Sequence, residues 1–151
     1  MRRRAPAAKL EHEGGSAIVE FVVVIVLLMV PLVYLLTAAL TVHRAVFASA
    51  QAVREAGRAF TLAPSAATGR AQALAATHLA FVDHGVQEPP DALEIRCLEG
   101  PCLSPGTAVE VEVTWKVPLP WVPDVVGIDR LAIPVSAVQR IPVDDFRGLP
   151  L

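Results

Sequence analysis

The residues with the clearest chemical potential lie near the N-terminus, where a long apolar run is preceded by Gly15, Ser16 and Glu20 and begins at Phe21. A membrane peptidase could cut the chain after Gly15, because a glycine offers no side chain to exclude from the enzyme. Glu20 places a carboxylate at the edge of the apolar run, where a charge is costly and is by default a functional candidate. The stretch therefore predicts a site of cleavage followed by a carboxylate with a specific role.

The apolar run comprises 22 residues without a charge, Phe21–Val42. As an α-helix it would be about 33 Å long, enough to cross a hydrocarbon core of about 30 Å. A secretory signal peptide, cut at Thr37-Ala38-Ala39, is a weaker interpretation, because the apolar core of such a peptide has only about 7–15 residues. An ordinary single-pass anchor explains the run but not the placement of Gly15 and Glu20.

The spacing of these residues resembles the processing site of type IV prepilins, with Glu20 as the fifth residue after Gly15. The Glu-Phe pair, the longer leader and the short soluble part are most similar to the TadE-like minor pseudopilins of tight-adherence pili. The resemblance implies that a prepilin peptidase cuts between Gly15 and Ser16. It also implies that Glu20 and Phe21 dock the subunit against its neighbours. The match covers about Gly15–Tyr34, and the rest of the chain agrees in layout alone.

The charges are unevenly distributed along the chain, whose formal net charge is -2. The leader, residues 1–15, contains the basic residues Arg2, Arg3, Arg4 and Lys9 and the acidic residues Glu11 and Glu13. Without the leader the net charge is -4, which argues against nucleic acid as a partner. By the positive-inside rule, the basic cluster predicts a cytoplasmic N-terminus and an extracytoplasmic C-terminal part.

Helical periodicity continues beyond the apolar run. It predicts a first helix over about Ala17–Leu62, with Pro31 inside it, and a second over about Ala67–His84, with Gly85 as its C-cap. The apolar seam of the first helix past the membrane would be Val46, Ala50, Val53, Gly57 and Phe60. The apolar stripe of the second would be Ala71, Leu74, Ala75, His78, Leu79 and Val82. We expect His78 to be a core or edge residue with a hydrogen bond.

After Pro89-Pro90 the pattern changes to the alternation that is typical of β-strands. The expected strands are Leu93–Cys97, Val109–Val117 and one that begins over Leu131–Ala137. Because the third contains Pro134, it should be an edge strand or carry a bulge.

Two further segments have weaker patterns. Pro118–Val126 is a proline-rich loop, in which Trp121 either covers the sheet of its own domain or contacts a partner subunit or the membrane surface. The tail from Asp144 is polar and is predicted to be loose.

Cys97 and Cys102 enclose a turn sequence between the first two expected strands. We predict that they form a disulfide, since the C-terminal part would lie in an oxidising compartment. Closing so small a loop stabilises the fold by about 2 kcal/mol in the chain-entropy model. A metal site would need two further ligands, and none stands nearby at the required spacing.

Motifs for catalysis are absent from the sequence: it has no glycine-rich phosphate loop, no Gly-x-Ser-x-Gly and no His-Glu-x-x-His. The histidines are His12, His43, His78 and His84, and paired Asp144 and Asp145 are more typical of solvated charges than of an acid–base pair. We therefore expect no enzyme, no cofactor, no metal and no small-molecule substrate. The expected partners are the membrane, a prepilin peptidase, and other pilins, pseudopilins and pilus assembly proteins.

These observations predict an α+β chain in three parts. Residues 1–15 are a prepilin leader, 16–62 a transmembrane and stalk helix, and 63–151 a small extracytoplasmic α+β domain with a second helix and an antiparallel sheet of about three strands. The resemblance implies a minor pseudopilin that is processed after Gly15 and acts in the assembly of a tight-adherence pilus. The alternatives are a single-pass membrane protein whose exported domain binds another envelope component, and a pseudopilin of a secretion system.

Overall fold

Helix α1 (Gly14–Leu62) is the longest element and is followed by helix α2 (Ala66–Asp83). Three strands come next: β1 (Leu93–Cys97), β2 (Ala108–Pro118) and β3 (Ala132–Pro142). This computed structural model describes residues 14–120 and 132–147, and it confirms the predicted α+β class and the order of the elements. The chain divides into two compact units between Thr37 and Ala38, and we call the second unit, from Ala38 onward, the head.

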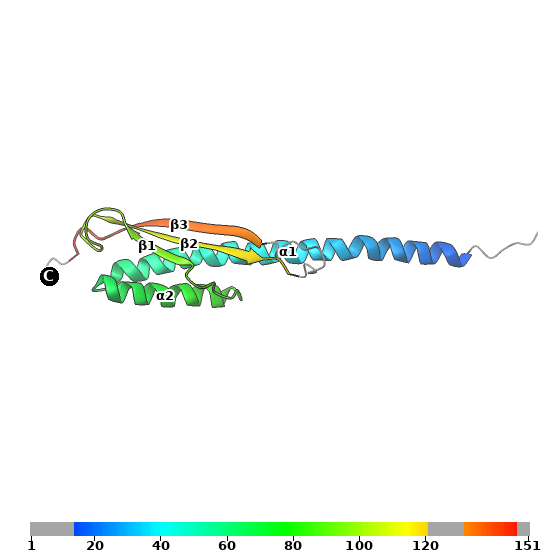
Figure 1. Cartoon of the computed structure of the whole chain (residues 1–151), viewed down its shortest axis with the longest axis horizontal. Helices are drawn as coiled ribbons and strands as arrows, with labels where there is room; N and C mark the ends of the chain where they lie inside the picture. Colours follow the sequence, from blue (N-terminus) through cyan, green and yellow to red (C-terminus); the bar gives the residue numbers. More distant parts are fainter. Residues whose placement is uncertain (1–13, 121–131, 148–151) are drawn as a thin grey trace, which may run out of the picture. The chain divides into compact units, whose positions relative to one another are not determined.

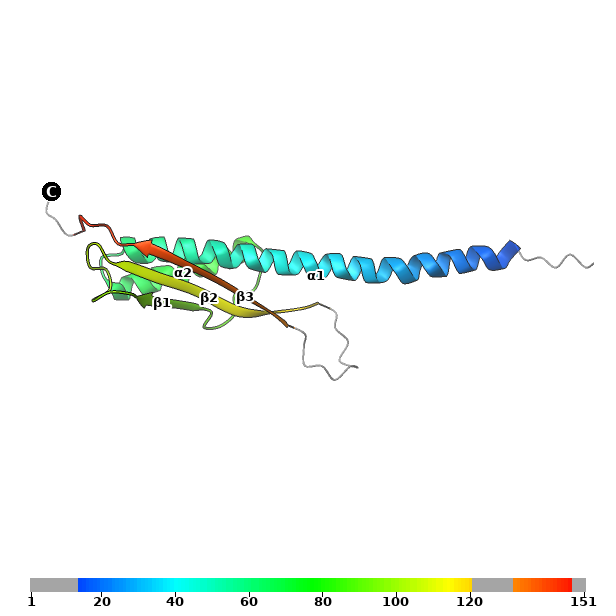
Figure 2. The same ribbon diagram turned by 90° about the horizontal axis from the view of Figure 1, so that it is seen from above.

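In the head, the three strands form a layer that packs on the two helices (Figure 1). Seen from above, the strands run along the helices rather than across them (Figure 2). Ile141 of β3 and Val111 of β2 lie against Gly57 of α1, while β1 contacts α2. The core therefore lies between the helix layer and the inner face of the sheet.

The face of α1 that turns to this core consists mainly of small residues. Its buried members include Ala45, Ala48, Ser49, Ala52, Val53, Ala56 and Phe60. The predicted seam is buried at Val53, Gly57 and Phe60, but it was wrong at Val46, which is exposed. The sheet comes so close that a Cβ added at Gly57 would lie 2.0 Å from Ile141 Cδ1. Small size, rather than apolar character alone, therefore decides which face of α1 is buried.

Helix α2 has clear signals at both ends. Ser65 is the N-cap, and its Oγ accepts a hydrogen bond from the backbone N–H of Thr68 at 3.2 Å. Gly85 has a φ of 63°, and its N–H donates to the carbonyl of Val82 at 2.9 Å. This left-handed conformation favours glycine, so the predicted role of Gly85 at the helix end is confirmed.

The buried face of α2 is not the predicted one. Its buried residues are Gly69, Ala73, Thr77, Ala80 and Phe81. In the predicted stripe, Leu74, Leu79 and Val82 are 54%, 61% and 55% exposed. The cause is the close approach of the two helices, because a Cβ at Gly69 would lie 3.0 Å from the ring of Phe60. Larger side chains do not fit this contact, so the prediction of the stripe was wrong.

The sheet is antiparallel, with the strand order β1-β2-β3. Along β2, Val109, Val111, Val113 and Val117 are buried and the residues between them are not, as the alternation predicts. β3 runs from Ala132 to Pro142 and thus continues past the residues over which it was predicted to begin. Because β3 is an edge strand of this sheet, it accommodates Pro134 as expected.

Residues 144–147 form a turn after β3, in which the N–H of Arg147 donates to the carbonyl of Asp144 at 3.2 Å, so the prediction of a loose tail from Asp144 was wrong for these residues. The guanidinium of Arg147 donates hydrogen bonds to the backbone carbonyls of Thr61 and Ala63. Thr61 lies in the last turn of α1 and Ala63 directly follows the helix, at an end where the last C=O groups lack helical partners. A cation is also favoured at a helix C-terminus. The leader residues 1–13 with His12, and the expected loop from Trp121 onward, lie outside the described residues.

Two buried hydroxyl groups in the head have different surroundings. Ser49 Oγ donates to the carbonyl of Ala45 at 2.9 Å and accepts from Trp115 Nε1 at 3.0 Å. Thr77 Oγ1 is buried and has no hydrogen-bond partner among the described residues. A buried polar group without a partner keeps its desolvation penalty, whereas a paired group recovers it.

We therefore expect Thr77→Val to stabilise the head and Ser49→Ala to destabilise it. The first change replaces an unpaired hydroxyl by a methyl group and should raise the free energy of unfolding by about 1 kcal/mol. The second leaves the indole N–H of Trp115 unpaired and should lower it by about 1–3 kcal/mol. Denaturant unfolding of the full chain in detergent micelles, followed by near-UV circular dichroism, measures both. Shifts of the same sign would contradict the hydrogen bonding described here.

Candidate functional site

The N-terminal motif lies in the first turns of α1, which begins at Gly14 rather than at the predicted Ala17. Glu20 follows Ser16 by one turn, and residues four apart lie on the same face of a helix. The Glu20 side chain is exposed, and it forms no ion pair or hydrogen bond with any described residue. Phe21 is also exposed. Both side chains are therefore free to meet a partner.

The apolar part of α1 has no cover within its own chain. From Ala17 to Val33 every side chain is exposed. Within the described residues, α1 is the helix that is long and apolar enough to cross a membrane, and no part of its most apolar stretch is buried. The core helix of a water-soluble protein would instead bury at least one face. The helix is compatible with a single-pass membrane anchor.

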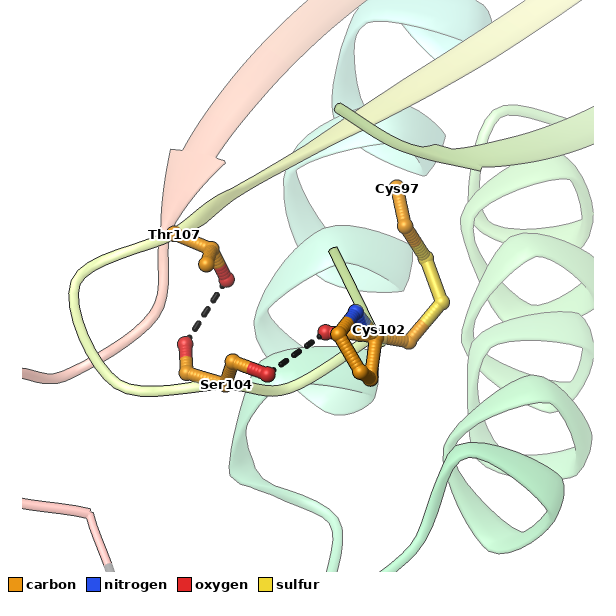
Figure 3. The surroundings of a disulfide bond; sticks show 5 residues. Cys97, Cys102, Ser104 and Thr107 are labelled. Atoms are coloured by element: carbon orange, nitrogen blue, oxygen red, sulfur yellow. Dashed lines mark hydrogen bonds between the residues drawn. A yellow bond between two sulfur atoms is a disulfide. The ribbon is translucent and has the colours of Figure 1, made fainter. Parts of the chain in front are cut away.

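Cys97 at the end of β1 is joined to Cys102 by a disulfide, as predicted (Figure 3). The two Cα atoms are 5.3 Å apart, within the usual range for such a bond. Beyond the disulfide, the hydroxyl of Ser104 donates to the carbonyl of Pro101 at 2.8 Å, and that of Thr107 donates to the carbonyl of Ser104 at 2.7 Å. These bonds hold the connection between β1 and β2.

The charged side chains on the outward face of the sheet pair with one another across the strands. Arg96 donates two hydrogen bonds of 2.7 Å to Glu94 and lies 3.2 Å from Glu112. Arg140 donates to Glu110 at 2.8 Å. The hydrogen bond from Arg96 lowers the pKa of Glu94, because it stabilises the ionised carboxylate. These exposed pairs contribute little to stability and leave the face without a strong excess of either charge.

The three described histidines have separate surroundings. His78 is exposed, so a core position is wrong, but its Nδ1 lies 2.9 Å from Glu88 Oε2, which confirms the expected hydrogen bond. His84 Nε2 lies 2.9 Å from Gln51 Oε1, and His43 stacks on a neighbouring phenylalanine. In residues 14–120 and 132–147, no group of three or more His, Cys, Asp or Glu side chains could hold a metal ion. That the chain is not an enzyme stays a prediction.

A groove of about 490 Å³ lies in the head beside the segment that connects α2 to β1. It is lined by Thr41, Arg44 and Ala45 of α1, by residues 85–90 and by residues 115–118 of β2. β1 pairs with β2 only as far as Val113, so the longer strand and helix border an open space beyond it. Sequence reasoning missed this groove. The sequence feature that could have pointed to it is Arg44, which lines the groove and is the first residue with a permanent charge after the apolar run.

Comparisons of the chain with protein-family models, with curated proteins and with solved structures find no match. The role of the chain must therefore be inferred from its own residues. The features that bear on this role are the N-terminal motif, the exposed apolar part of α1 and the head with its disulfide.

We expect the double substitution Cys97→Ser with Cys102→Ser to lower the free energy of unfolding by about 2 kcal/mol, because the unfolded chain loses a constraint on its entropy. Adding a reductant to the wild-type chain should produce a similar loss, and adding it to the double variant should change nothing. Denaturant unfolding of the full chain in detergent micelles measures these differences. Non-reducing peptide mapping of exported protein should show the two cysteines linked, and two free thiols there would contradict the disulfide.

Proposed function

We propose that this chain is a minor pseudopilin of the TadE-like kind, processed after Gly15 and used in the assembly of a tight-adherence pilus. The observation that carries the proposal is the register of Gly15, Ser16, Glu20 and Phe21 with the start of a long apolar helix. An ordinary anchor needs the apolar length, but it has no need of a glycine and a carboxylate at this spacing. A small α+β head, which begins within this same helix, supports the proposal as well.

In this proposal a prepilin peptidase hydrolyses the Gly15–Ser16 peptide bond on the cytoplasmic side of the membrane. The bond lies in the first turn of α1, where the backbone N–H groups have no helical acceptor. Glycine also lowers helix stability by about 1 kcal/mol relative to alanine, and Gly14 and Gly15 occupy this turn together. The turn therefore opens at low cost and presents the bond to the enzyme. Water adds across it, leaving a carboxylate on Gly15 and an ammonium on Ser16.

Cleavage would leave two opposite charges near the start of the mature helix. The ammonium of Ser16 would stand one turn before the carboxylate of Glu20. A carboxylate that enters hydrocarbon costs about 3 kcal/mol or more unless it is paired. Two partners are available: the ammonium of the same chain and the ammonium of a neighbouring subunit. The second pairing also fixes the axial register of two subunits, because only one stagger brings the charges together.

The first prediction from this proposal concerns cleavage. In a host that contains a prepilin peptidase, the mature protein should begin at Ser16. Gly15→Leu should block processing, because the leucine side chain must be accommodated next to the scissile bond. Gly14→Leu is the matched control and should still be processed. Intact mass and N-terminal sequencing of the purified protein measure the outcome. An unprocessed wild-type chain that begins at Met1, or a cut near Ala39, would contradict the pseudopilin proposal.

The second prediction concerns the carboxylate. Glu20→Ala should still be inserted and cut after Gly15, but it should no longer support pilus assembly, because the neighbouring ammonium would lose its partner. Glu55→Ala, which removes an exposed carboxylate from the head part of the same helix, should assemble like the wild type. Electron microscopy of surface pili, together with the N-terminal sequence of each variant, separates assembly from processing. Normal pili on cells that carry Glu20→Ala would rule out a docking role for the carboxylate.

A further inference from the structure

The sheet has two outer strands, β1 and β3, and their free edges present different backbone groups. Directly after β3, the N–H of Val143 donates to the carbonyl of Thr107 at 2.8 Å. By the alternation of an antiparallel ladder, the odd-numbered residues of β3 bond to β2, and the even-numbered ones face outward. Pro134 and Pro142 thus stand on the free edge, where neither has an N–H to donate. Prolines in these places hinder the pairing of a further strand with β3.

The free edge of β1 has no such obstruction. The N–H of Thr114 donates to the carbonyl of Ala92 at 3.1 Å, so the even-numbered residues along β1 bond to β2. The backbone N–H and C=O groups that point away from the sheet have no partner among the described residues, and they belong to Leu93, Ile95 and Cys97. An edge of this kind is a template for one more strand.

A hollow of about 250 Å³ lies beside the free edge of β1. It is lined by residues of α2 and β1, namely Arg70, Leu74, Leu93, Glu94 and Ile95. Leu74 is 54% exposed there. A residue that pairs with Ile95 in an added strand would have its side chain on the same face as Ile95, and thus at this hollow. The hollow therefore suits an apolar side chain of a strand that extends the sheet.

The unpaired charge in the hollow belongs to α2. Arg70 is exposed and forms no ion pair with any described residue. Glu94, by contrast, accepts two hydrogen bonds of 2.7 Å from Arg96. The hollow thus offers one guanidinium to a ligand, and a carboxylate matches the planar donors of that group.

The direction of α2 fixes the order of these groups along the edge. α2 and β1 run in opposite directions (Figure 1), so Arg70 lies nearer the end of β1 than Leu74 does. An added strand would meet the guanidinium opposite Cys97, and it would meet apolar side chains opposite Leu93 and Ile95. If it runs antiparallel to β1, the matching segment has an acidic residue followed by two apolar residues at alternate positions.

We propose that the head binds an extended segment of another protein, which adds a fourth strand antiparallel to β1. Its backbone pairs with the free edge of β1, its first apolar side chain contacts Leu74, and its acidic residue binds Arg70. The segment is not β1 of a second copy, because two-fold symmetry would place the α2 of that copy under β1, where α2 already packs. The interaction needs neither cleavage after Gly15 nor pilus assembly, so it goes beyond the proposed function.

The probe is a fluorescein-labelled peptide, Thr-Asp-Thr-Leu-Lys-Val-Thr-amide, whose aspartate, leucine and valine stand opposite Cys97, Ile95 and Leu93. Fluorescence anisotropy with the full chain in detergent micelles should show saturable binding that micelles alone do not show. N-methylation of the leucine, whose N–H faces β1, should abolish this binding. N-methylation of the lysine, whose N–H points away from β1, is the matched control and should leave the Kd unchanged.

Substitutions in α2 test the hollow. Leu74→Ala should raise the Kd about fivefold, because the peptide buries less apolar surface. Leu79→Ala changes a similarly exposed residue of α2 outside the hollow and should leave the Kd unchanged. Arg70→Gln should raise the Kd about threefold for the aspartate peptide and should not affect a peptide with asparagine in its place. Near-UV circular dichroism shows that each variant is folded.

Equal binding of the two N-methylated peptides would overturn the proposal, because the edge of β1 would then not be the pairing site. Absence of saturable binding by the parent peptide, or equal weakening by Leu74→Ala and Leu79→Ala, would overturn it as well. Dimers of the chain that the parent peptide dissociates, measured by light scattering, would assign the edge to a second copy and also overturn it. None of these results alters the N-terminus of the mature protein, so they leave the pseudopilin proposal to its own tests.

Discussion

The head depends on how closely α1 lets its neighbours approach. Alanines at positions 48, 52 and 56 form most of its buried face, and at Gly57 even one more methyl group would collide with β3. Gly69 plays the same part in α2, where the ring of Phe60 lies against its backbone. Since these contacts leave little room, the large buried side chains are few: Phe60 of α1, Phe81 of α2 and the valines of β2. Leu74, Leu79 and Val82 of α2 turn outward, because the contact between the helices has no space for them.

The first part of α1 has large, exposed side chains in place of the small, buried ones found in the head. Between Ala17 and Val33 the helix presents large apolar side chains on all sides and buries none of them. One helix thus changes from bulky residues, suited to lipid or to neighbouring subunits, to small residues, suited to close packing within the chain. In the proposed function, the carboxylate of Glu20 marks one position along this otherwise apolar surface, at which a neighbouring subunit can dock. Without such a group, apolar helices could slide along one another at little cost.

The parts of the fold that local signals specify could be predicted from the sequence. Ser65 and Gly85 mark the ends of α2, alternating valines mark β2, and a turn between two cysteines marks the disulfide. The sequence could not show which face of α2 is buried, because that depends on the distance between two helices. The groove was missed for a related reason, since it arises where β1 stops short of β2. Of the candidate site, the positions of Glu20 and Phe21 on α1 could be predicted from the sequence, whereas the partners proposed for them would lie outside the single chain.

The contact between Arg147 and the end of α1 has a consequence for the order in which the molecule is completed. Arg147 stands 86 residues after Thr61 and 84 after Ala63, whose carbonyls it binds. A chain that emerges from its N-terminus has both helices and all three strands available before this residue appears. Until then only water satisfies those carbonyls. The last turn of α1 is therefore closed only after the chain has been synthesised beyond β3, and a chain that stops just short of Arg147 would contain every described helix and strand while its longest helix kept an open end.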